Sequence, residues 1–179
     1  MALSLLLLLM SLAVHELGHW MLLTRFKVNV TEYWVGVGIR IFKFRKLNIG
    51  LFPIGASLHP DIQAFNALPA SSRLAIALAG PAASALYAAT LYLASFSLAG
   101  DAAVTSLQTL AYLNLLIALF NLFPIPPLDG WVAFSSLVEH LGRPLRASSH
   151  AIAGRVGNGV IYGIGFFVLW GLLRLWLQS

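Results

Sequence analysis

The first apolar run of the chain contains three ionisable side chains close together. From Leu3 to Leu23 the polar residues are Ser4, Ser11, His15, Glu16 and His19. An apolar run of this length is long enough to span a bilayer as one helix. Ionisable groups are costly inside a membrane, and those found there mark a functional site by default. This cost disfavours the alternative of a stray polar cluster on a membrane helix.

The spacing of these ionisable residues is typical of a metal-binding helix. His15 and His19 are four residues apart, so on a helix they project from one face, one turn apart. Two imidazoles placed in this way can bind one zinc ion. Glu16 can then take a proton from a metal-bound water. The pattern therefore predicts a metal site within the first helix.

The composition indicates a membrane protein of one domain over residues 1–179. Hydrophobic residues make up 59% of the chain and charged residues only 9%, with a mean hydropathy of +0.85; a soluble domain of this size does not need such values. The chain has no cysteine, so a metal must be held by nitrogen and oxygen ligands. The net charge of +5 does not indicate nucleic acid as a partner, because the basic residues flank apolar spans.

We expect a mainly α, polytopic membrane protein with four transmembrane helices. The expected spans are residues 2–25, 74–100, 103–123 and 156–177. The second span begins with many small residues, which favour close helix packing. A short helix is expected over residues 131–141 and a polar loop over residues 142–154.

The region from residue 28 to residue 60 has strand periodicity. Apolar and basic residues alternate over residues 39–45, and four glycines punctuate the region. We expect a hairpin or small sheet that turns near residues 45–48. Its apolar side is rich enough to associate with the membrane, although alternation alone leaves an ordinary cytoplasmic hairpin open.

The third span ends at a segment with three prolines in four positions, which cannot continue a helix. Asp129 follows these prolines and is well placed to be the oxygen ligand that the two histidines lack. The alternative is that Asp129 caps the helix that begins at Gly130, which is a common role for aspartate. From the residues alone, both interpretations stay open.

The basic residues predict the orientation in the membrane. With four spans, ten of the eleven Lys and Arg residues fall on one side and only Arg174 lies near the other. The positive-inside rule then places both termini outside. The metal site lies nearer the Arg25 end of the first helix and opens toward the cytoplasm. The predicted location is the cell membrane, with several passes.

Three motifs together resemble the site-2 protease family of intramembrane zinc metalloproteases. They are His-Glu-Leu-Gly-His at residues 15–19, Ala-Gly-Pro-Ala-Ala at residues 79–83, and Asn-Leu-Phe-Pro-Ile-Pro-Pro-Leu-Asp-Gly at residues 121–130. The family also has a membrane-associated β region after its first motif, which resembles residues 28–60 here. One departure is Trp131, which stands where family members often carry a second glycine after Leu-Asp-Gly.

The resemblance implies roles for five residues. It implies that His15, His19 and Asp129 bind one zinc ion per chain, that Glu16 is the catalytic base, and that Asn121 positions the substrate. The implied activity is cleavage of the transmembrane segments of membrane proteins within the lipid bilayer. The other histidines are His59, His140 and His150. We interpret these three as surface or interface residues, because three protein ligands and a water complete a catalytic zinc site.

An alternative function is a zinc-binding membrane protein without protease activity that binds or sequesters other transmembrane segments. A structural zinc site is closed by four protein ligands, whereas a catalytic site leaves one position to water. Transport is not supported, because the two halves of the chain show no inverted repeat. The expected partners are transmembrane protein substrates and the lipid bilayer, with no oligomeric state specified.

Overall fold

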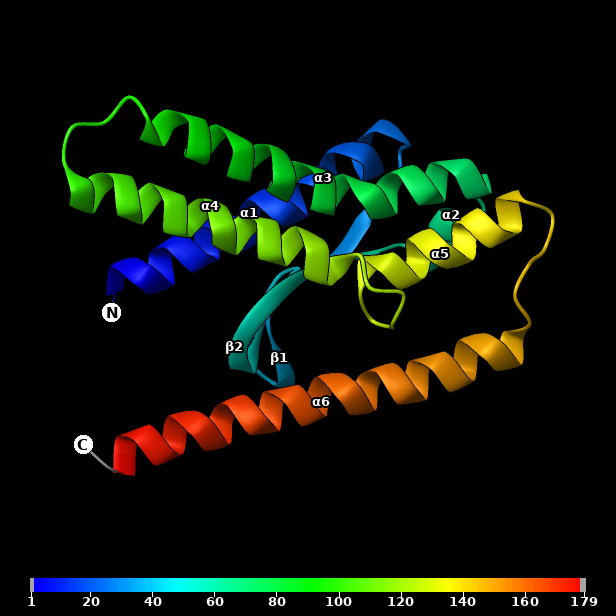
Figure 1. Ribbon diagram of the computed structural model, residues 1–179. Coiled ribbons are helices and arrows are strands. Elements are labelled where there is room, and N and C mark those ends of the chain that lie inside the picture. Colours follow the sequence, from blue (N-terminus) through cyan, green and yellow to red (C-terminus); the bar gives the residue numbers. More distant parts are fainter. Residues whose placement is uncertain (1, 178–179) are drawn as a thin grey trace.

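The computed structural model describes residues 2–177, which form a mainly helical protein with one small sheet (Figure 1). In chain order the elements are α1 (Ala2–Arg25), β1 (Val30–Phe44), β2 (Leu47–Pro60), α2 (Ile62–Asn66), α3 (Ala70–Ser95), α4 (Asp101–Asn121), α5 (Asp129–His140) and α6 (Ala147–Leu177). The expected fold class, mainly helical with a small β region after the first helix, is therefore confirmed. By length and composition, α3 and α4 could each cross a membrane.

Helix α3 is the centre of the helical bundle and packs against α1, α4 and α5. A Cβ atom added to Gly18 of α1 would lie 2.3 Å from the Ala79 carbonyl oxygen of α3, so the two helices touch there through their backbones. Small residues on α3 make this approach possible. The structure thus confirms the close packing that the small residues of this segment predict.

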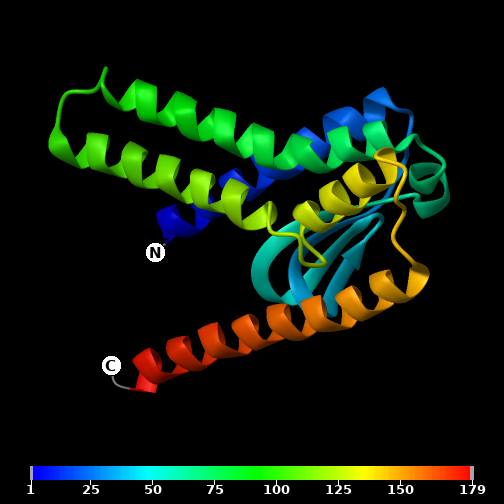
Figure 2. The same ribbon diagram turned by 45° about the vertical axis from the view of Figure 1, so that its right-hand side comes forward.

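Helices α4 and α5 lie end to end along α3, with the proline-rich loop between them (Figure 2). The backbone at Gly130 packs tightly against the start of this loop. A Cβ atom there would lie 2.2 Å from the Leu122 carbonyl oxygen and 2.4 Å from that of Phe123. The break between the two helices falls partway along the bundle, and α5 begins there with Asp129. This geometry places a carboxylate inside the bundle.

Helices α6 and α3 differ most from their expected bounds. Helix α6 begins at Ala147, so the expected loop over residues 142–154 is wrong in its second half. Residues 147–153 contain neither glycine nor proline, and the helix extends back through them ahead of its apolar part. Helix α3 occupies residues 70–95 rather than 74–100, and Gly100, at a φ of 113°, lies in the link to α4.

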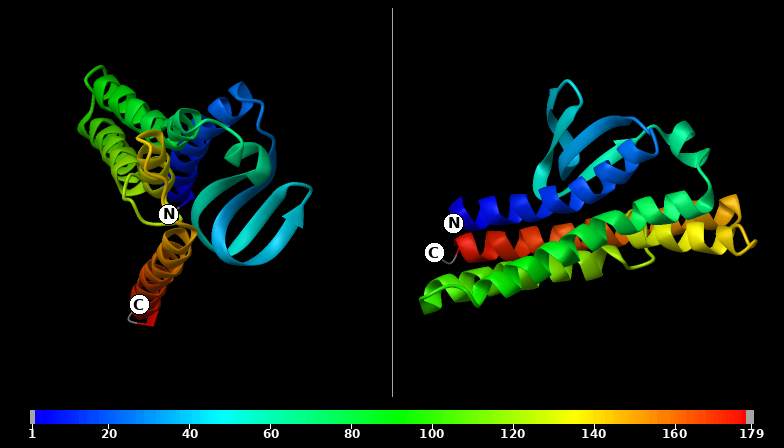
Figure 3. Two further views of the ribbon diagram at one scale, coloured as in Figure 1. Left: turned by 90° about the vertical axis from the view of Figure 1, so that its right-hand side faces the viewer. Right: turned by 90° about the horizontal axis from the view of Figure 1, so that it is seen from above.

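The hairpin turns at Arg45 and Lys46, as expected, and then folds back on itself (Figure 3). The two strands are antiparallel. Residues 47–49 pair with residues 42–44 across the turn and also with residues 33–35. Both strands must bend to allow this double pairing, and each contains a glycine with positive φ, Gly36 at 84° and Gly55 at 85°.

Buried apolar contacts join the first helix to the hairpin and to α3. Leu23, Val28, Val30 and Ile76 form this cluster, and Leu23 is only 2% exposed. It ties the end of α1 to the start of β1 and to the first half of α3. Strand β2 also packs against α1, so the hairpin is held beside the helix that carries the two histidines.

Candidate metal centre

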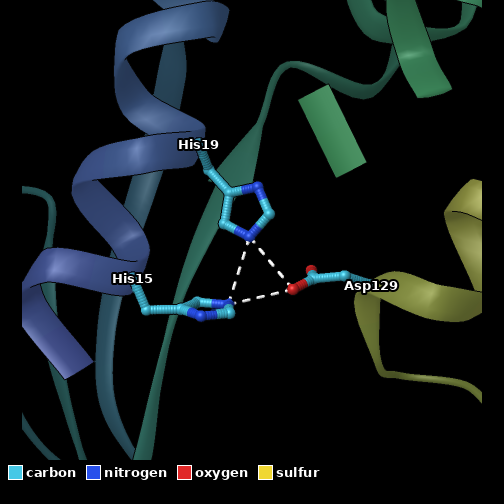
Figure 4. Close-up of side chains that lie close together, drawn as sticks. All are labelled: His15, His19 and Asp129. Carbon is cyan, nitrogen blue, oxygen red and sulfur yellow. Dashed lines mark hydrogen bonds and ion pairs between the residues drawn. The ribbon is translucent and has the colours of Figure 1, made fainter. Parts of the chain in front are cut away.

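His15, His19 and Asp129 come together inside the bundle (Figure 4). The two histidines are one turn apart on α1 and are 4% and 8% exposed. Asp129 Oδ2 lies 2.9 Å from His15 Nε2 and 3.1 Å from His19 Nε2. The two Nε2 atoms are 3.3 Å apart. Three possible ligand atoms from two helices therefore converge on one point.

The outer nitrogen of each imidazole is held by α3. His19 Nδ1 donates a hydrogen bond to the Ile76 carbonyl oxygen at 2.8 Å. A carbonyl accepts only, so the proton of neutral His19 lies on Nδ1 and the Nε2 lone pair faces Asp129. His15 Nδ1 lies 3.0 Å from the Ser84 hydroxyl. Such partners fix the ring orientation of metal-binding histidines.

This arrangement fits a metal ion. Zinc bonds of 2.0–2.2 Å to nitrogen and oxygen, arranged as a tetrahedron, place neighbouring ligand atoms about 3.3 Å apart. The three separations of 2.9–3.3 Å match that edge. Without a cation, two imidazole nitrogens and a carboxylate would meet in an apolar bundle with incompletely balanced charge. The donor set of two imidazoles and one carboxylate is one that zinc accepts in catalytic sites.

Asp129 does not cap α5. Leu128 is the N-cap residue, and its helix end has no side-chain cap bond. Asp129 is the first residue inside α5, and its carboxylate reaches across to the histidines instead of folding back on its own helix. The capping alternative is therefore wrong, because the broken segment directs this side chain into the bundle.

Glu16 lies next to the converging atoms without joining them. Among the described residues, the group that could hold a metal ion comprises His15, His19 and Asp129. Glu16 follows His15 by one residue, which is about 100° around the helix. It is half-buried, and Leu58 of β2, a strand that packs against α1, lies near its carboxylate. Glu16 is therefore placed between α1 and the hairpin.

The other residues singled out in the sequence lie outside this group of three. The Asn121 amide donates to the Ile117 carbonyl of its own helix at 2.9 Å, so its substrate-positioning role stays a prediction. His59 stacks on Trp34 with ring centroids 6.1 Å apart. His150 contacts the Trp131 ring edge-on at 5.5 Å.

Gly80 and Ser84 of α3 were missed by the sequence reasoning as parts of this site. A Cβ atom at Gly80 would lie 2.2 Å from His19 Nε2 and 2.7 Å from His15 Nε2. Gly80 and Ser84 are one helical turn apart and both buried, as are the two histidines that they face. Gly80 and Ser84 have the same four-residue spacing as His15 and His19, which is a signal in the sequence. Many other small residues of α3 have this spacing too, so it does not single out these two.

The chain matches the sequence family described as Peptidase family M50, over residues 3–105 and 97–164. A candidate zinc metalloprotease of Mycobacterium tuberculosis, Rip3, is 35% identical over 179 residues, which cover 95% of this chain and 41% of that protein. A candidate zinc metalloprotease of Thermotoga maritima is 35% identical over 97 residues, covering 45% of this chain and 19% of that protein.

A solved structure shows the same likeness. The site-2 protease from Methanocaldococcus jannaschii superimposes with a TM-score of 0.58 and 26% sequence identity, covering 95% of this chain and 67% of that one. The chain spans less than half the length of the curated relatives it matches.

Proposed function

The chain belongs to peptidase family M50, the site-2 protease family, and on this premise we propose that it is an intramembrane zinc metalloprotease that cleaves transmembrane segments of membrane proteins. The observation that carries the proposal is the convergence of His15, His19 and Asp129. Three donors, not four, meet at this point among the described residues, and a set of three protein ligands is typical of a catalytic zinc site. This count favours a protease over a zinc-binding protein without activity.

His15, His19 and Asp129 would hold one zinc ion per chain. Zinc, when bound, polarises a substrate carbonyl and lowers the pKa of water toward about 7. The protein supplies the rest of the environment. Ser84 and the Ile76 carbonyl orient the imidazoles, and Gly80 leaves room beside their Nε2 atoms.

Glu16 is the proposed general base. Its carboxylate takes a proton from the attacking water and passes this proton to the leaving amine, so that hydrolysis breaks the peptide C–N bond and yields a carboxylate and an amine. Its position supports this role, because it follows a proposed ligand by one residue and is not itself part of the converging group. A base must reach the reacting water without occupying the metal.

The hairpin is the proposed guide for the substrate. A transmembrane helix hides its peptide bonds, so the substrate must unwind locally before cleavage. A segment that pairs with strand backbone is held extended. The packing of β2 against α1 supports this role, because α1 carries the proposed base and Leu58 of β2 lies near Glu16. Asn121, at the end of α4, is the proposed substrate-positioning residue.

We place four spans in the membrane, formed by α1, α3, α4 and α6, with both termini outside and the site open to the cytoplasm. The start of α1, the end of α6 and the α3–α4 link lie at one end of the molecule, and the end of α1 and the α5–α6 link lie at the other (Figure 1). Large apolar side chains cover outer surfaces, such as Leu86 (71% exposed), Leu93 (66%) and Leu116 (61%). This outer surface suits lipid better than water.

The test is to co-reconstitute wild type and two variants with a panel of single-span proteins. Glu16→Gln should keep zinc near one per chain and keep the fold, but lose detectable cleavage, since a general base contributes about 10²–10⁴-fold. His15→Ala should lose both zinc and cleavage. Undiminished cleavage by Glu16→Gln would contradict the assignment of the base. Zinc binding by wild type without cleavage of any substrate would favour the non-proteolytic alternative.

A further inference from the structure

A polar pocket lies where the first helix meets the hairpin. Its volume is about 220 Å³, and its walls come from the end of α1, the link to β1 and the hairpin turn. Its polar and aromatic lining residues are Trp20, Thr24, Lys27, Asn29, Tyr33 and Lys46. None of them belongs to the candidate metal centre, and neither the proposed chemistry nor the substrate path uses them.

The chain reverses direction at Lys27, and this reversal forms one side of the pocket. Lys27 has a φ of 58°, in the left-handed region. The backbone amides of Lys27 and Val28 donate to the carbonyls of Thr24 and Leu23 at 3.0 and 2.9 Å. The last carbonyls of α1 are thus partly satisfied within the chain, which weakens the repulsion that an open helix end exerts on an anion.

The folded-back hairpin turn brings a second lysine to the pocket. Lys46 Nζ donates to the Val30 carbonyl at 2.6 Å, and the Lys46 carbonyl accepts from the Tyr33 amide at 2.7 Å. An ammonium group has three protons, so one anchors it to the wall and two remain for a ligand. The fold therefore fixes a positive charge in place before any ligand arrives.

The two lysines give this pocket a net positive charge, because its lining contains no acidic residue. The acids of neighbouring segments are engaged elsewhere. Glu32 accepts a hydrogen bond from the Trp34 indole at 2.9 Å, which lowers the pKa of this carboxyl. Asp61 accepts from two backbone amides at the start of α2. The charge of Lys27 and Lys46 is therefore available to a ligand.

The chemistry of the lining suits a phosphate group. Two ammonium groups, the hydroxyls of Thr24 and Tyr33 and the amide of Asn29 can all donate to phosphate oxygens, which accept several hydrogen bonds at once. The volume of about 220 Å³ is below the 300–1,000 Å³ of typical small-molecule sites. It has room for a phosphate with a small substituent.

We propose that this pocket binds the phosphate of an anionic phospholipid head group. Trp20 lines the pocket and is 42% exposed, and Met21 beside it is 59% exposed. A tryptophan at the end of a membrane helix marks the lipid head-group level, and clustered lysines there attract anionic lipids. The acyl chains then lie along the exposed Trp20 side of α1. The inference rests on the proposed membrane embedding of α1 and not on proteolysis.

The test measures lipid binding to the full-length protein in a neutral detergent. Native mass spectrometry and thermal unfolding would follow titration with short-chain phosphatidylglycerol, with phosphatidylcholine, or with inorganic phosphate. The pocket variant is Lys27→Gln with Lys46→Gln. The matched control, Lys43→Gln with Arg45→Gln, removes the same charge from the hairpin outside the pocket lining. Zinc content and cleavage are measured on the same samples.

We expect phosphatidylglycerol to bind wild type and the control alike and the pocket variant at least about tenfold more weakly, since each lysine near an anionic head group contributes about 1 kcal/mol. Equal weakening in both variants would show diffuse surface attraction and overturn the proposal. Inorganic phosphate that binds and stabilises as well as the lipid would overturn the lipid assignment. Unchanged zinc content shows that the pocket variant is folded. If wild type binds the lipid but cleaves no substrate, that result would count against the proposed protease function and would leave the lipid site supported.

Discussion

The Arg73 guanidinium of α3 and the Glu139 carboxylate of α5 form an ion pair at the opposite end of the helix that begins with Asp129. Helix α5 packs mainly on α3. Its first turn is held by Gly130 against the carbonyls of the preceding loop, and its last turn is held by this pair. The position of the proposed carboxylate ligand therefore depends on contacts at both ends of a short helix.

Breaking this pair should weaken zinc binding from a distance. Glu139→Gln leaves a largely buried Arg73, whose Nε already has no partner, without its counter-charge. Exposed pairs contribute about 0.2–1 kcal/mol, and Glu139 is 43% exposed, so we expect a loss of zinc affinity of only severalfold. Competition with a chelator measures it.

The control for this effect is Glu32→Gln, which removes an acidic partner of Lys43 on the hairpin with the same charge change. It should leave zinc affinity unchanged. The exchanged pair Arg73→Glu with Glu139→Arg should recover part of the loss. Equal zinc affinities for Glu139→Gln and Glu32→Gln would show that the pair does not position Asp129.

Replacement of Gly80 by alanine should remove the metal site. In an ordinary helix this change stabilises by about 0.5–1 kcal/mol. At Gly80 the new methyl group would lie 2.2 Å from His19 Nε2, so the imidazoles or the helices must move. We expect zinc affinity to fall at least about tenfold with a stability loss of about 1–3 kcal/mol from overpacking. Metal analysis and thermal unfolding check both.

Gly159→Ala is the matched control for Gly80→Ala, because a Cβ atom at Gly159 of α6 meets nothing within 4 Å. It should keep full zinc content and unfold at the same temperature or slightly higher. If Gly80→Ala also kept full zinc content, the close approach of α3 to the imidazoles would not be needed for metal binding.

Removal of the Ser84 hydroxyl should lower zinc affinity while the fold is kept. This hydroxyl is the partner of His15 Nδ1 at 3.0 Å. Loss of such a partner typically costs 10–100-fold in metal affinity. Ser95→Ala is the control, since Ser95 is equally buried on the same helix and donates to the Tyr92 carbonyl instead. Identical zinc affinities in the two variants would remove Ser84 from the site.

The sequence predicts those residues of the candidate site that lie close together on one helix. It predicts fewer of the residues that only the packing of helices brings to the site. His15, Glu16 and His19 follow from helical spacing, which is a local property. Asp129 could be proposed from its broken segment, but a cap was equally open until the structure directed its carboxylate to α1. Gly80 is different: which of many small residues faces the histidines depends on the rotation of α3, which no local pattern specifies.

The same distinction holds for the fold. The helices and the hairpin follow from apolar length and alternation, which are properties of single segments. The fold-back of the hairpin does not, because residues 47–49 pair both across the turn and with residues 33–35. That second pairing brings Lys46 to the end of α1 and so forms the polar pocket that Lys27 and Lys46 line. Alternation of apolar and polar residues predicts that segments form strands, but it does not predict which strand edges pair with each other.

The proposed topology can be tested with single cysteines, because the chain has none of its own. Ser148 is exposed in the first turn of α6, and Ser97 is exposed in the link between α3 and α4. The first turn of α6 and the α3–α4 link lie at opposite ends of the molecule (Figure 1). The bias of basic residues places Ser148 in the cytoplasm and Ser97 outside.

In intact cells, a membrane-impermeant thiol reagent should therefore label Ser97→Cys and not Ser148→Cys. Permeabilised cells should show labelling of both, which controls for a buried or unreactive thiol. The ten basic residues on one side make the inverted orientation costly, because each would have to cross the membrane during insertion. Labelling of Ser148→Cys but not Ser97→Cys in intact cells would invert the topology. The metal centre would then open to the outside, and its substrates would be cut from that face.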